Sequence, residues 1–433
     1  MQTDSNRALV EHCFRHEYGR LVAVLTRALG VRNLELVEDV VQAALAKAIH
    51  AWAQKGVPND PAAWLYRTAR NLAIDSIRRA QVEKRIVAEN SLEHAFLAED
   101  DPVANTAEVE DSSLRFLFLC CHPSIPLESS VAIALKTVSG FSTEEIATAF
   151  LITKSNAEKR ITRAKEKLRE GGIEIADLNR HSMEPRLAAV QSTIYLLFNE
   201  GYSSSSGDVA LRKDLCDEAI RLARMLIQHT QLAPASSAAL LALMLMHAAR
   251  FDARVDTNGA IVLLESQDRS RWNWSLIREA MQWMAHSTET NQLSRFHIES
   301  AIAWEHCRAT TFEAIEWPRV VELYLALERL CPSPMIRLNQ AIAWSFVAGP
   351  EAGLERLIDI PESDRIRLRP WWDCAVAEAY HRLGKNTEAI AHWTDALSLT
   401  QGTAHRELIA RKLANSQGKH EIDFSVSGRS AIQ

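Results

Sequence analysis

Seven lysine and arginine side chains are gathered between residues 154 and 169, in the segment KSNAEKRITRAKEKLR, although the whole chain has a formal net charge of -6. Lysine and arginine bind phosphate oxygens, and an arginine can also donate two parallel hydrogen bonds to the edge of a guanine. On charge alone, a solvated amphipathic helix is the better explanation of such a segment. The residues that would face duplex DNA are Lys154, Ser155, Asn156, Lys159, Arg160, Arg163 and Lys167, with Arg160 or Arg163 able to reach a guanine.

The residues around this segment predict a helix-turn-helix that holds the basic side chains in place. Ser142 followed by Glu145 has the pattern of a capping box and starts one helix, which continues to Phe150. A three-residue turn follows, and Thr153 or Ser155 can cap the second helix. Apolar residues then recur at helical steps and form one stripe: Ala157, Ile161, Ala164 and Leu168. The cap, the turn and the stripe favour a helix whose basic outer face lies in a major groove.

A second group of basic residues lies beside aromatic residues upstream, in PNDPAAWLYRTARNLAIDSIRRA. Arg67, Arg70 and Arg78 follow helical spacing, and Trp64 and Tyr66 lie near the start of the expected helix. Cations bind the phosphates of a single strand and flat rings stack on its unpaired bases, so this pattern suits single-stranded DNA. The alternative is that Trp64 and Tyr66 belong to the core, because aromatic residues at helical spacing more often do.

The segments around the two basic helices indicate the order of the parts. VEDVVQAALAKAIHAW predicts a helix with Glu38 and Asp39 near its N-terminal end, and this helix could be a protein-docking face. In residues 86–112 every charged residue is acidic, which favours a linker over a core. A second break follows near residues 170–185. We therefore expect domains over residues 1–85, 113–172 and 183–420, with an acidic linker over 86–112.

Composition excludes several classes of protein. Hydrophobic residues make up 47% of the chain and charged residues 24%, as in soluble globular proteins. The seven cysteines have no regular spacing, so they indicate a reducing compartment rather than a disulfide framework. Cys120, Cys121 and His122 lack a second pair of ligands at zinc-finger spacing, so we expect half-buried helix residues and no metal site. Because no apolar run is long enough to span a membrane, the expected location is the cytoplasm, without membrane contact.

The C-terminal part of the chain contains repeated helix pairs, and strand patterns are nearly absent throughout. The clearest pair is WWDCAVAEAYHRLGKNTEAIAHWTDALSL, from Trp371 to Leu399. Small and aromatic residues have the spacing of a tetratricopeptide helix pair: Ala377, Tyr380, Gly384, Ala389, Trp393 and Ala396. The expected fold is all-α, with two small helical domains followed by a tetratricopeptide-like helical solenoid.

Two polar clusters in this part could form an interaction site. The first contains Asn199, Glu200 and Tyr202, and the second contains Gln267, Asp268, Arg269, Arg271 and Trp272. Helix capping and ion pairs between helices are the simpler explanation, and a groove that binds a regulatory protein is the functional one. Neither a catalytic triad nor a phosphate-binding loop nor a metal cluster is evident, so we expect no enzyme activity and no cofactor.

With these motifs in order, the chain resembles the extracytoplasmic-function (ECF) sigma factors of bacterial RNA polymerase. The resemblance rests on DVVQAALAKAIHAW, WLYRTARNLAIDSIRR and FSTEEIATAF followed by KRITRAKEKL. Further segments are similar to a subgroup with a large tetratricopeptide-like C-terminal extension: LRFLFLCCHPSIP, GVPNDPAAWL, LLFNEGYSSSSGD, LLALMLMHAAR, QDRSRW and SPMIRLNQAIA.

The resemblance implies a role for each part. Residues 7–82 would be region 2, which docks on the β′ clamp helices of the polymerase core through Glu38, Asp39, Gln42 and Lys47. The melted minus-10 strand would contact Lys55, Asn59, Trp64, Tyr66, Arg67, Arg70, Asn71, Arg78 and Arg79, with one base flipped into a loop pocket. The helix-turn-helix would be region 4, which reads the minus-35 element as duplex, and the acidic linker would thread the polymerase channels.

The function that this resemblance predicts is promoter-specific transcription initiation. The expected partners are RNA polymerase core, through its β′ and β subunits, promoter DNA and a regulatory protein at the C-terminal domain. The alternative is a helix-turn-helix regulator that binds operator DNA without polymerase and uses its C-terminal helices as an adaptor. Asp39 and Gln42 distinguish the two, because only the sigma factor needs a polymerase-docking helix.

Overall fold

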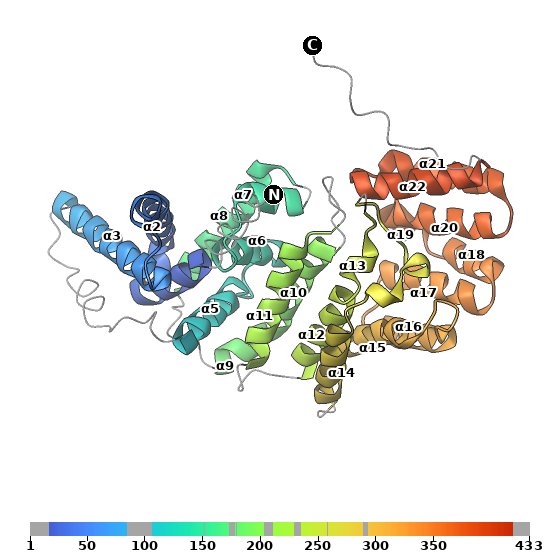
Figure 1. Ribbon diagram of the computed structural model, residues 1–433, viewed down its shortest axis with the longest axis horizontal. Helices are drawn as coiled ribbons and strands as arrows, with labels where there is room; N and C mark the ends of the chain where they lie inside the picture. The colour runs from blue at the N-terminus through green and yellow to red at the C-terminus, as the bar shows by residue number, and fades with distance from the viewer. Residues whose placement is uncertain are drawn as a thin grey trace, which may run out of the picture. The chain divides into compact units, whose positions relative to one another are not determined.

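The computed structural model describes residues 17–84, 106–150, 152–172, 178, 180–202, 211–228, 235–257, 259–288 and 293–418 (Figure 1). Within these ranges the chain is helical, and its extended pairing is one isolated antiparallel bridge between Val255 and Ile261. The expected all-α fold is therefore confirmed.

The chain divides into two compact units. Unit 1 consists of Met1–Phe198 and Asp217–Ala233, and unit 2 consists of Asn199–Cys216 and Pro234–Gln433. The division falls within α10 (Leu187–Tyr202) and within α11 (Lys213–Gln228). The sequence indicates an earlier break, near residues 170–185, because glycine and proline interrupt the helical pattern there. That segment contains the short α9 (Arg180–Met183) and η4 (Glu184–Arg186).

The first part of unit 1 is built from helical residues 17–29, η1 (Val31–Asn33), α2 (Leu34–Lys55) and α3 (Pro61–Lys84). Gly56 ends α2 with a φ of 79°, a value that glycine adopts without strain. The carboxylate of Asp60 accepts a hydrogen bond of 2.9 Å from the backbone N–H of Ala63, which satisfies one exposed donor of the first turn of α3. The two helices pack against each other, and both bury apolar residues at helical spacing: Val37, Val41, Ala44, Ala48, Leu65, Ala69 and Ala73.

The second part of unit 1 contains α5 (Thr106–Cys120), α6 (Leu127–Thr137), α7 (Thr143–Ala149) and α8 (Lys154–Gly171). The capping box is confirmed: Ser142 N–H donates to the Glu145 carboxylate at 2.7 Å, and Glu145 N–H donates to Ser142 Oγ at 3.1 Å. Thr153, rather than Ser155, caps α8 by accepting from Asn156 N–H at 3.2 Å. The predicted apolar stripe of α8 is buried throughout: Ala157, Ile161, Ala164 and Leu168.

The expected acidic linker is shorter than the sequence indicates. Residues 86–105 lie outside the described residues, whereas residues 106–112 form the beginning of α5. Three of the acidic residues in the expected linker, Glu108, Glu110 and Asp111, therefore belong to a helix. The apolar residues that follow on this helix, among them Phe116, Leu117 and Phe118, are completely buried. This packing explains why the helix continues through an acidic start.

Unit 2 begins around one central helix. α12 (Ala235–Ala248) is apolar on nearly every side and is buried along most of its length, as expected for a helix inside a core. α14 (Trp274–Ser287) and α15 (Arg295–Arg308) pack against it. Between α12 and α14 the chain forms α13 (Phe251–Arg254), η5 (Leu264–Ser266) and η6 (Arg269–Arg271).

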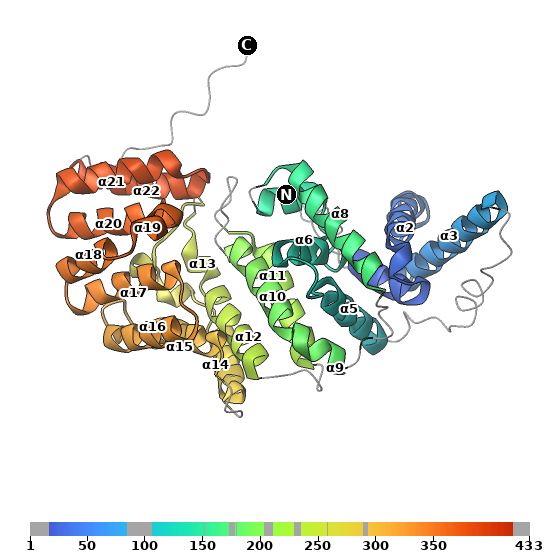
Figure 2. The same cartoon turned by 180° about the vertical axis from the view of Figure 1, so that it is seen from behind.

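The remainder of unit 2 is a succession of helices that pack mainly against helices one or two places away in sequence (Figures 1 and 2). These are α16 (Trp317–Leu330), α17 (Pro334–Val347), α18 (Pro350–Ile358), α19 (Glu362–Leu368), α20 (Trp371–Arg382), α21 (Asn386–Leu399) and α22 (Thr403–Ser416). Ala377, Ala389 and Ala396 are completely buried with Trp393 between α20 and α21, as the repeat pattern predicts. Contacts between successive helices are characteristic of a helical solenoid.

Candidate nucleic-acid interface

Some of the cations on the outer face of α8 form ion pairs with glutamates, and others do not. Lys159 and Arg163 are exposed and have no acidic partner among the residues that the structure describes. Arg160, the other candidate for a guanine contact, is half-buried and donates to Glu128 at 2.6 Å. Lys154 pairs with Glu144, and Lys167 pairs with Glu170 at 2.8 Å. Arg163 is therefore the better placed arginine for a base edge.

The ion pairs on this face are weak and exchangeable. A hydrogen bond with Glu144 raises the pKa of Lys154, and one with Glu170 raises the pKa of Lys167, but all four side chains are exposed. Exposed pairs contribute little to stability because water and salt screen them. Ser155 and Asn156 are also exposed, in the first turn of α8. The exposed cations can therefore exchange their carboxylate partners for phosphates.

One further pair links α8 to α2 and corrects an expectation. Lys165 donates to the carboxylate of Glu38, whose side chain is only 7% exposed. Arg169 and Glu35 lie 3.6 Å apart beside this pair. Glu38 was expected to dock on polymerase, but its carboxylate is buried and paired with Lys165, so it is not available for that contact. Asp39 and Gln42, in contrast, are exposed on α2.

A hollow of about 520 Å³ lies where α2 ends and α3 begins. Trp64 lines it from α3, and its ring meets that of Trp52 edge to face, with centroids 5.6 Å apart. Lys47, His50 and Lys55 line it from α2. An aromatic ring beside cations suits an unstacked nucleotide, since the ring can stack on a base and the cations can bind its phosphate. Lys47, expected at the docking face, lies in this hollow instead.

The other candidate residues of α3 differ in accessibility. Arg67, Asn71, Arg78 and Arg79 are exposed, Arg70 is half-buried, and Asn59 is exposed in the loop before the helix. Tyr66 is only 2% exposed, so its ring belongs to the core and cannot stack on a base in this conformation. The sequence could not separate Trp64 from Tyr66, because two residues so close together lie on different faces of a helix that only tertiary packing identifies.

Arginines contact both polar clusters of unit 2, and two of them, Arg250 and Arg254, were not singled out from the sequence. Tyr202 accepts hydrogen bonds from Arg250 at 2.6 Å through its hydroxyl and from Arg254 at 3.2 Å through its backbone oxygen. Arg269 donates to the backbone oxygens of His306 and Ala309, both at 2.8 Å, and lies over the Trp272 ring at 4.3 Å.

These contacts favour a structural role for most of the second cluster. Gln267 and Trp272 are buried, and Asp268 caps η6 by accepting from Ser270. Arg271 is exposed, and Asn199 and Glu200 are partly exposed. Gln267 and Trp272 are therefore not available to a protein partner, contrary to expectation. The capping explanation, which was the alternative, accounts for Asp268.

Two histidines within this arrangement are held neutral. Burial, together with Arg250 and Arg269, lowers the pKa of His306 to about 3. Burial also lowers the pKa of His247 well below its ordinary value, with Arg250 acting in the same direction. A protonated histidine here would be desolvated and repelled by the neighbouring arginines, so the folded state favours the neutral ring.

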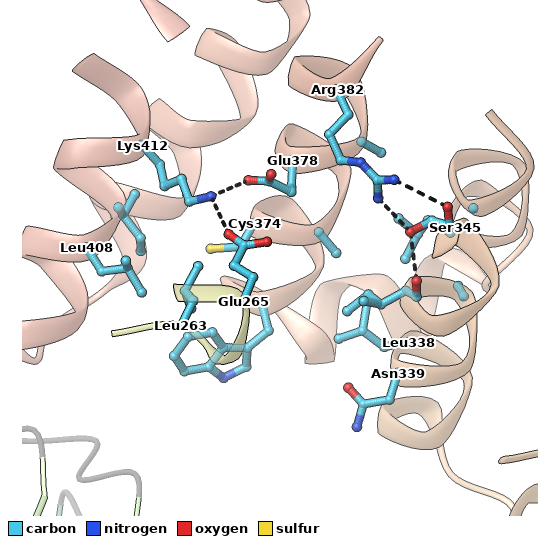
Figure 3. A pocket seen from close by; sticks show the side chains of 18 of the residues that line it. Leu263, Glu265, Leu338, Asn339, Ser345, Cys374, Glu378, Arg382, Leu408 and Lys412 are labelled. Atoms are coloured by element: carbon cyan, nitrogen blue, oxygen red, sulfur yellow. Dashed lines mark hydrogen bonds and ion pairs between the residues drawn. The ribbon is translucent and has the colours of Figure 1, made fainter. Parts of the chain in front are cut away.

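The sequence did not reveal a cavity of about 600 Å³ within unit 2 (Figure 3). Its walls come mainly from η5, α17, α20 and α22, with smaller contributions from α13, α18 and α21, and these elements lie far apart in sequence. Ile342 and Trp371, which remain exposed on their helices, line it, but the sequence shows only that they are apolar. A single apolar residue on a helix does not indicate which neighbours surround it, so the cavity follows only from the packing of the helices.

Cys120 and Cys121 are buried, and their thiols lie 3.7 and 3.5 Å from the hydroxyls of Thr137 and Thr193. They are thus more deeply buried than the sequence indicated. Across the described parts of the chain, no group of three or more metal-ligating side chains comes together. The helices described are all too short or too polar to cross a membrane.

Comparison with known proteins defines the class to which this arrangement belongs. Family models match Sigma-70 region 2 over residues 13–83, Sigma-70 region 4 over residues 115–168, and a family of unknown function, DUF6596, over residues 186–288. The first match covers α2, nearly all of α3 and the hollow between them, and the second covers the capped N-terminus and most of α8. The two Sigma-70 matches identify the domains of a sigma factor, a class of transcription-initiation proteins that act with RNA polymerase core and promoter DNA.

A second comparison found a relative whose sequence aligns with almost the whole chain. "Uncharacterized protein R00370" of Rhizobium meliloti (strain 1021) is 37% identical over 400 residues, which cover 91% of this chain and 94% of the relative. The chain belongs to the same family as this relative, and its own Sigma-70 and DUF6596 domains are consistent with an ECF-like sigma factor that has a C-terminal extension. No solved structure matches the chain.

Proposed function

We propose that this protein is an ECF-type sigma factor that binds RNA polymerase core, directs initiation at particular promoters and is regulated through protein contacts of its C-terminal helices. The observation that carries the proposal is that one chain joins region 2 to region 4, each with an exposed basic surface. A polymerase-independent regulator needs the second surface but has no use for the first.

In the proposed mechanism the hollow between α2 and α3 receives a flipped base of the minus-10 element. The Trp64 ring stacks on the base, and Lys55 and Lys47 bind the flanking phosphates. Arg67, Asn71 and the exposed arginines at the end of α3 follow the strand beyond the hollow. Unpairing a base costs a few kcal/mol, which stacking at about 1–3 kcal/mol per base and phosphate contacts can offset.

Region 4 reads the minus-35 element as duplex DNA through α8. Arg163 contacts a guanine edge, Lys159 binds a phosphate, and the N-terminal turn of the helix approaches the backbone. Removal of one bidentate arginine–guanine contact costs about 1–3 kcal/mol, or roughly 5- to 150-fold in affinity.

Docking on the polymerase is assigned to the exposed Asp39 and Gln42 of α2, which meet the β′ clamp helices. An acidic protein can work in this way because much of the affinity for DNA comes from the core enzyme, and a modest basic surface limits non-specific binding. Such a protein acts in the cytoplasm, on the nucleoid. The solenoid in unit 2 supports the regulatory role, since stacked helices present a continuous surface for another protein.

The test is run-off transcription with purified core polymerase and a promoter library, using the full chain and three variants. We expect Asp39→Ala combined with Gln42→Ala to abolish transcription while duplex binding is retained, and Arg163→Gln to weaken minus-35 recognition. Arg329→Gln, which changes an exposed arginine of α16, is the matched control. If the full chain neither binds core nor supports initiation but still shifts duplex DNA, it is a polymerase-independent regulator.

A further inference from the structure

We propose that unit 2 contains a binding site for an amphipathic organic anion, a molecule with an apolar chain or ring system and one negatively charged group. The site is the cavity of about 600 Å³ between η5, α17, α20 and α22 (Figure 3). The proposal concerns binding by unit 2 and does not depend on the sigma-factor function.

The size and the walls of the cavity suit a small organic molecule. Ligand sites in proteins are typically about 300–1,000 Å³, with mostly apolar walls and a few polar groups. Leu338 and Ile342 line the cavity from α17, Trp371 lines it from the start of α20, and Leu408 and Ile409 line it from α22. Trp371 and Ile342 are 39% and 37% exposed, so part of the apolar surface is accessible to a ligand.

The acidic groups of the cavity are already matched by a cation. Lys412 Nζ lies 3.0 Å from the Glu378 carboxylate and 3.5 Å from that of Glu265, and Figure 3 shows a contact from it to each. Lys412 thus occupies the position that the ammonium group of a ligand would take. His405, which also lines the cavity, is disfavoured as a cation because burial lowers its pKa.

Arg382 is a cation of the cavity that has no counter-charge among the residues that the structure describes. It donates to Ser345 Oγ at 3.0 Å and to the Ser345 backbone oxygen at 3.4 Å, and its guanidinium lies 4.7 Å from the centre of the Phe346 ring. No carboxylate among the described residues pairs with it. A guanidinium has five N–H donors, so further donors remain for a ligand oxygen.

A second arginine reinforces this charge. Arg254 lines the cavity, donates to the Tyr202 backbone oxygen at 3.2 Å and stacks on the Tyr202 ring at 4.0 Å, also without a carboxylate partner in the described chain. The lining therefore has three cations and two carboxylates. A single anionic group balances this excess, and the apolar walls bind the remainder of the molecule.

The test is isothermal titration of the full chain with decanoate below its micellar concentration. Decan-1-ol and decyltrimethylammonium have the same chain length with a neutral and a positive head group. We expect one site per chain that binds decanoate about tenfold or more tightly than either control, because a charge-assisted hydrogen bond is stronger than a neutral one.

Two variants assign the site. Arg382→Gln should weaken decanoate about tenfold and leave decan-1-ol unchanged, whereas Arg367→Gln, at an exposed arginine of α19 outside the cavity, should change neither. Ile342→Trp fills the cavity from its open side and should abolish binding of both. Circular dichroism checks that each variant is folded.

Equal affinity for the three compounds, binding unaffected by Arg382→Gln, or binding that survives Ile342→Trp would each overturn the proposal. Transcription assays report separately on the sigma-factor function, so failure of this site leaves that function untouched and the reverse also holds.

Discussion

The pair between Lys165 of α8 and Glu38 of α2 predicts an asymmetric response to mutation. Lys165→Met leaves the Glu38 carboxylate buried without its cation, while Glu38→Gln leaves Lys165, whose side chain is 16% exposed and can move its ammonium towards water. We therefore expect the lysine variant to be the more damaging, although each removes the same ion pair.

The magnitude follows from the burial of the two groups. Breaking a fully buried pair by removing one partner costs about 3–5 kcal/mol. Because Lys165 is partly exposed, we take the lower end, about 3 kcal/mol, for Lys165→Met. For Glu38→Gln we expect about 1 kcal/mol, the value of an ordinary hydrogen bond. The double variant should cost less than Lys165→Met alone, because it leaves no buried charge.

Hydrogen exchange followed by mass spectrometry measures this locally, which avoids assuming a single unfolding transition for the chain. Peptides from α2 and α8 should exchange more than about 100-fold faster in Lys165→Met, since about 3 kcal/mol corresponds to that factor. Lys167→Met is the matched control, because Lys167 and Glu170 are both exposed. If the amides of α2 and α8 are as well protected from exchange in Lys165→Met as in Lys167→Met, the reasoning about the buried carboxylate is refuted.

Three further predictions concern the stability of the helices. An unfolded histidine has a pKa of ~6.5, whereas the pKa of folded His306 is about 3. The stability that this residue contributes is therefore fully present above pH ~6.5 and is lost as the pH falls towards 3. Hydrogen exchange of α15 peptides over a pH series measures this loss. A constant exchange protection over that range would contradict it. Gly201→Ala should destabilise the fold by about 1–3 kcal/mol, measured as a lower melting temperature. The new Cβ would lie 2.7 Å from Cys216 Sγ and 2.8 Å from the Arg212 backbone oxygen. Gly171→Ala, with open space around the new Cβ, is the control. Trp393→Ala should destabilise α20 and α21 by about 3–5 kcal/mol, because Trp393 is only 4% exposed, and a chemical denaturation midpoint unchanged from that of Arg367→Gln would refute this.

The features that the sequence predicted well are local. The capping box at Ser142, the cap at Thr153 and the stripe of α8 depend on residues within a few positions of one another, and spacing alone determines which side chains share a face. The helix pair around Trp393 was predictable for the same reason, since small residues at fixed steps indicate where two helices approach.

The features that the sequence missed depend on contacts between distant segments. Glu38 and Lys165 are separated by 127 positions, and no periodic pattern relates them. The burial of Tyr66 and the exposure of Arg163 are likewise decided by the helices packed against them. The clusters around Tyr202 and Arg269 were noticed for their polarity, but their arginine and histidine neighbours come from α12, from α13 and the residue before it, and from α15.

The carboxylates around α8 also set how strongly salt should affect its binding to DNA. If all seven of its lysines and arginines displaced counterions from phosphates, the logarithm of the binding constant would fall with the logarithm of salt concentration with a slope of about -6. Glu128, Glu144 and Glu170 already act as built-in counterions for Arg160, Lys154 and Lys167, and Glu38 and Glu35 do the same for Lys165 and Arg169. Lys159 and Arg163 alone would give a slope of about -2. Isolated minus-35 binding should therefore tolerate changes in ionic strength far better than the sequence of this helix indicates.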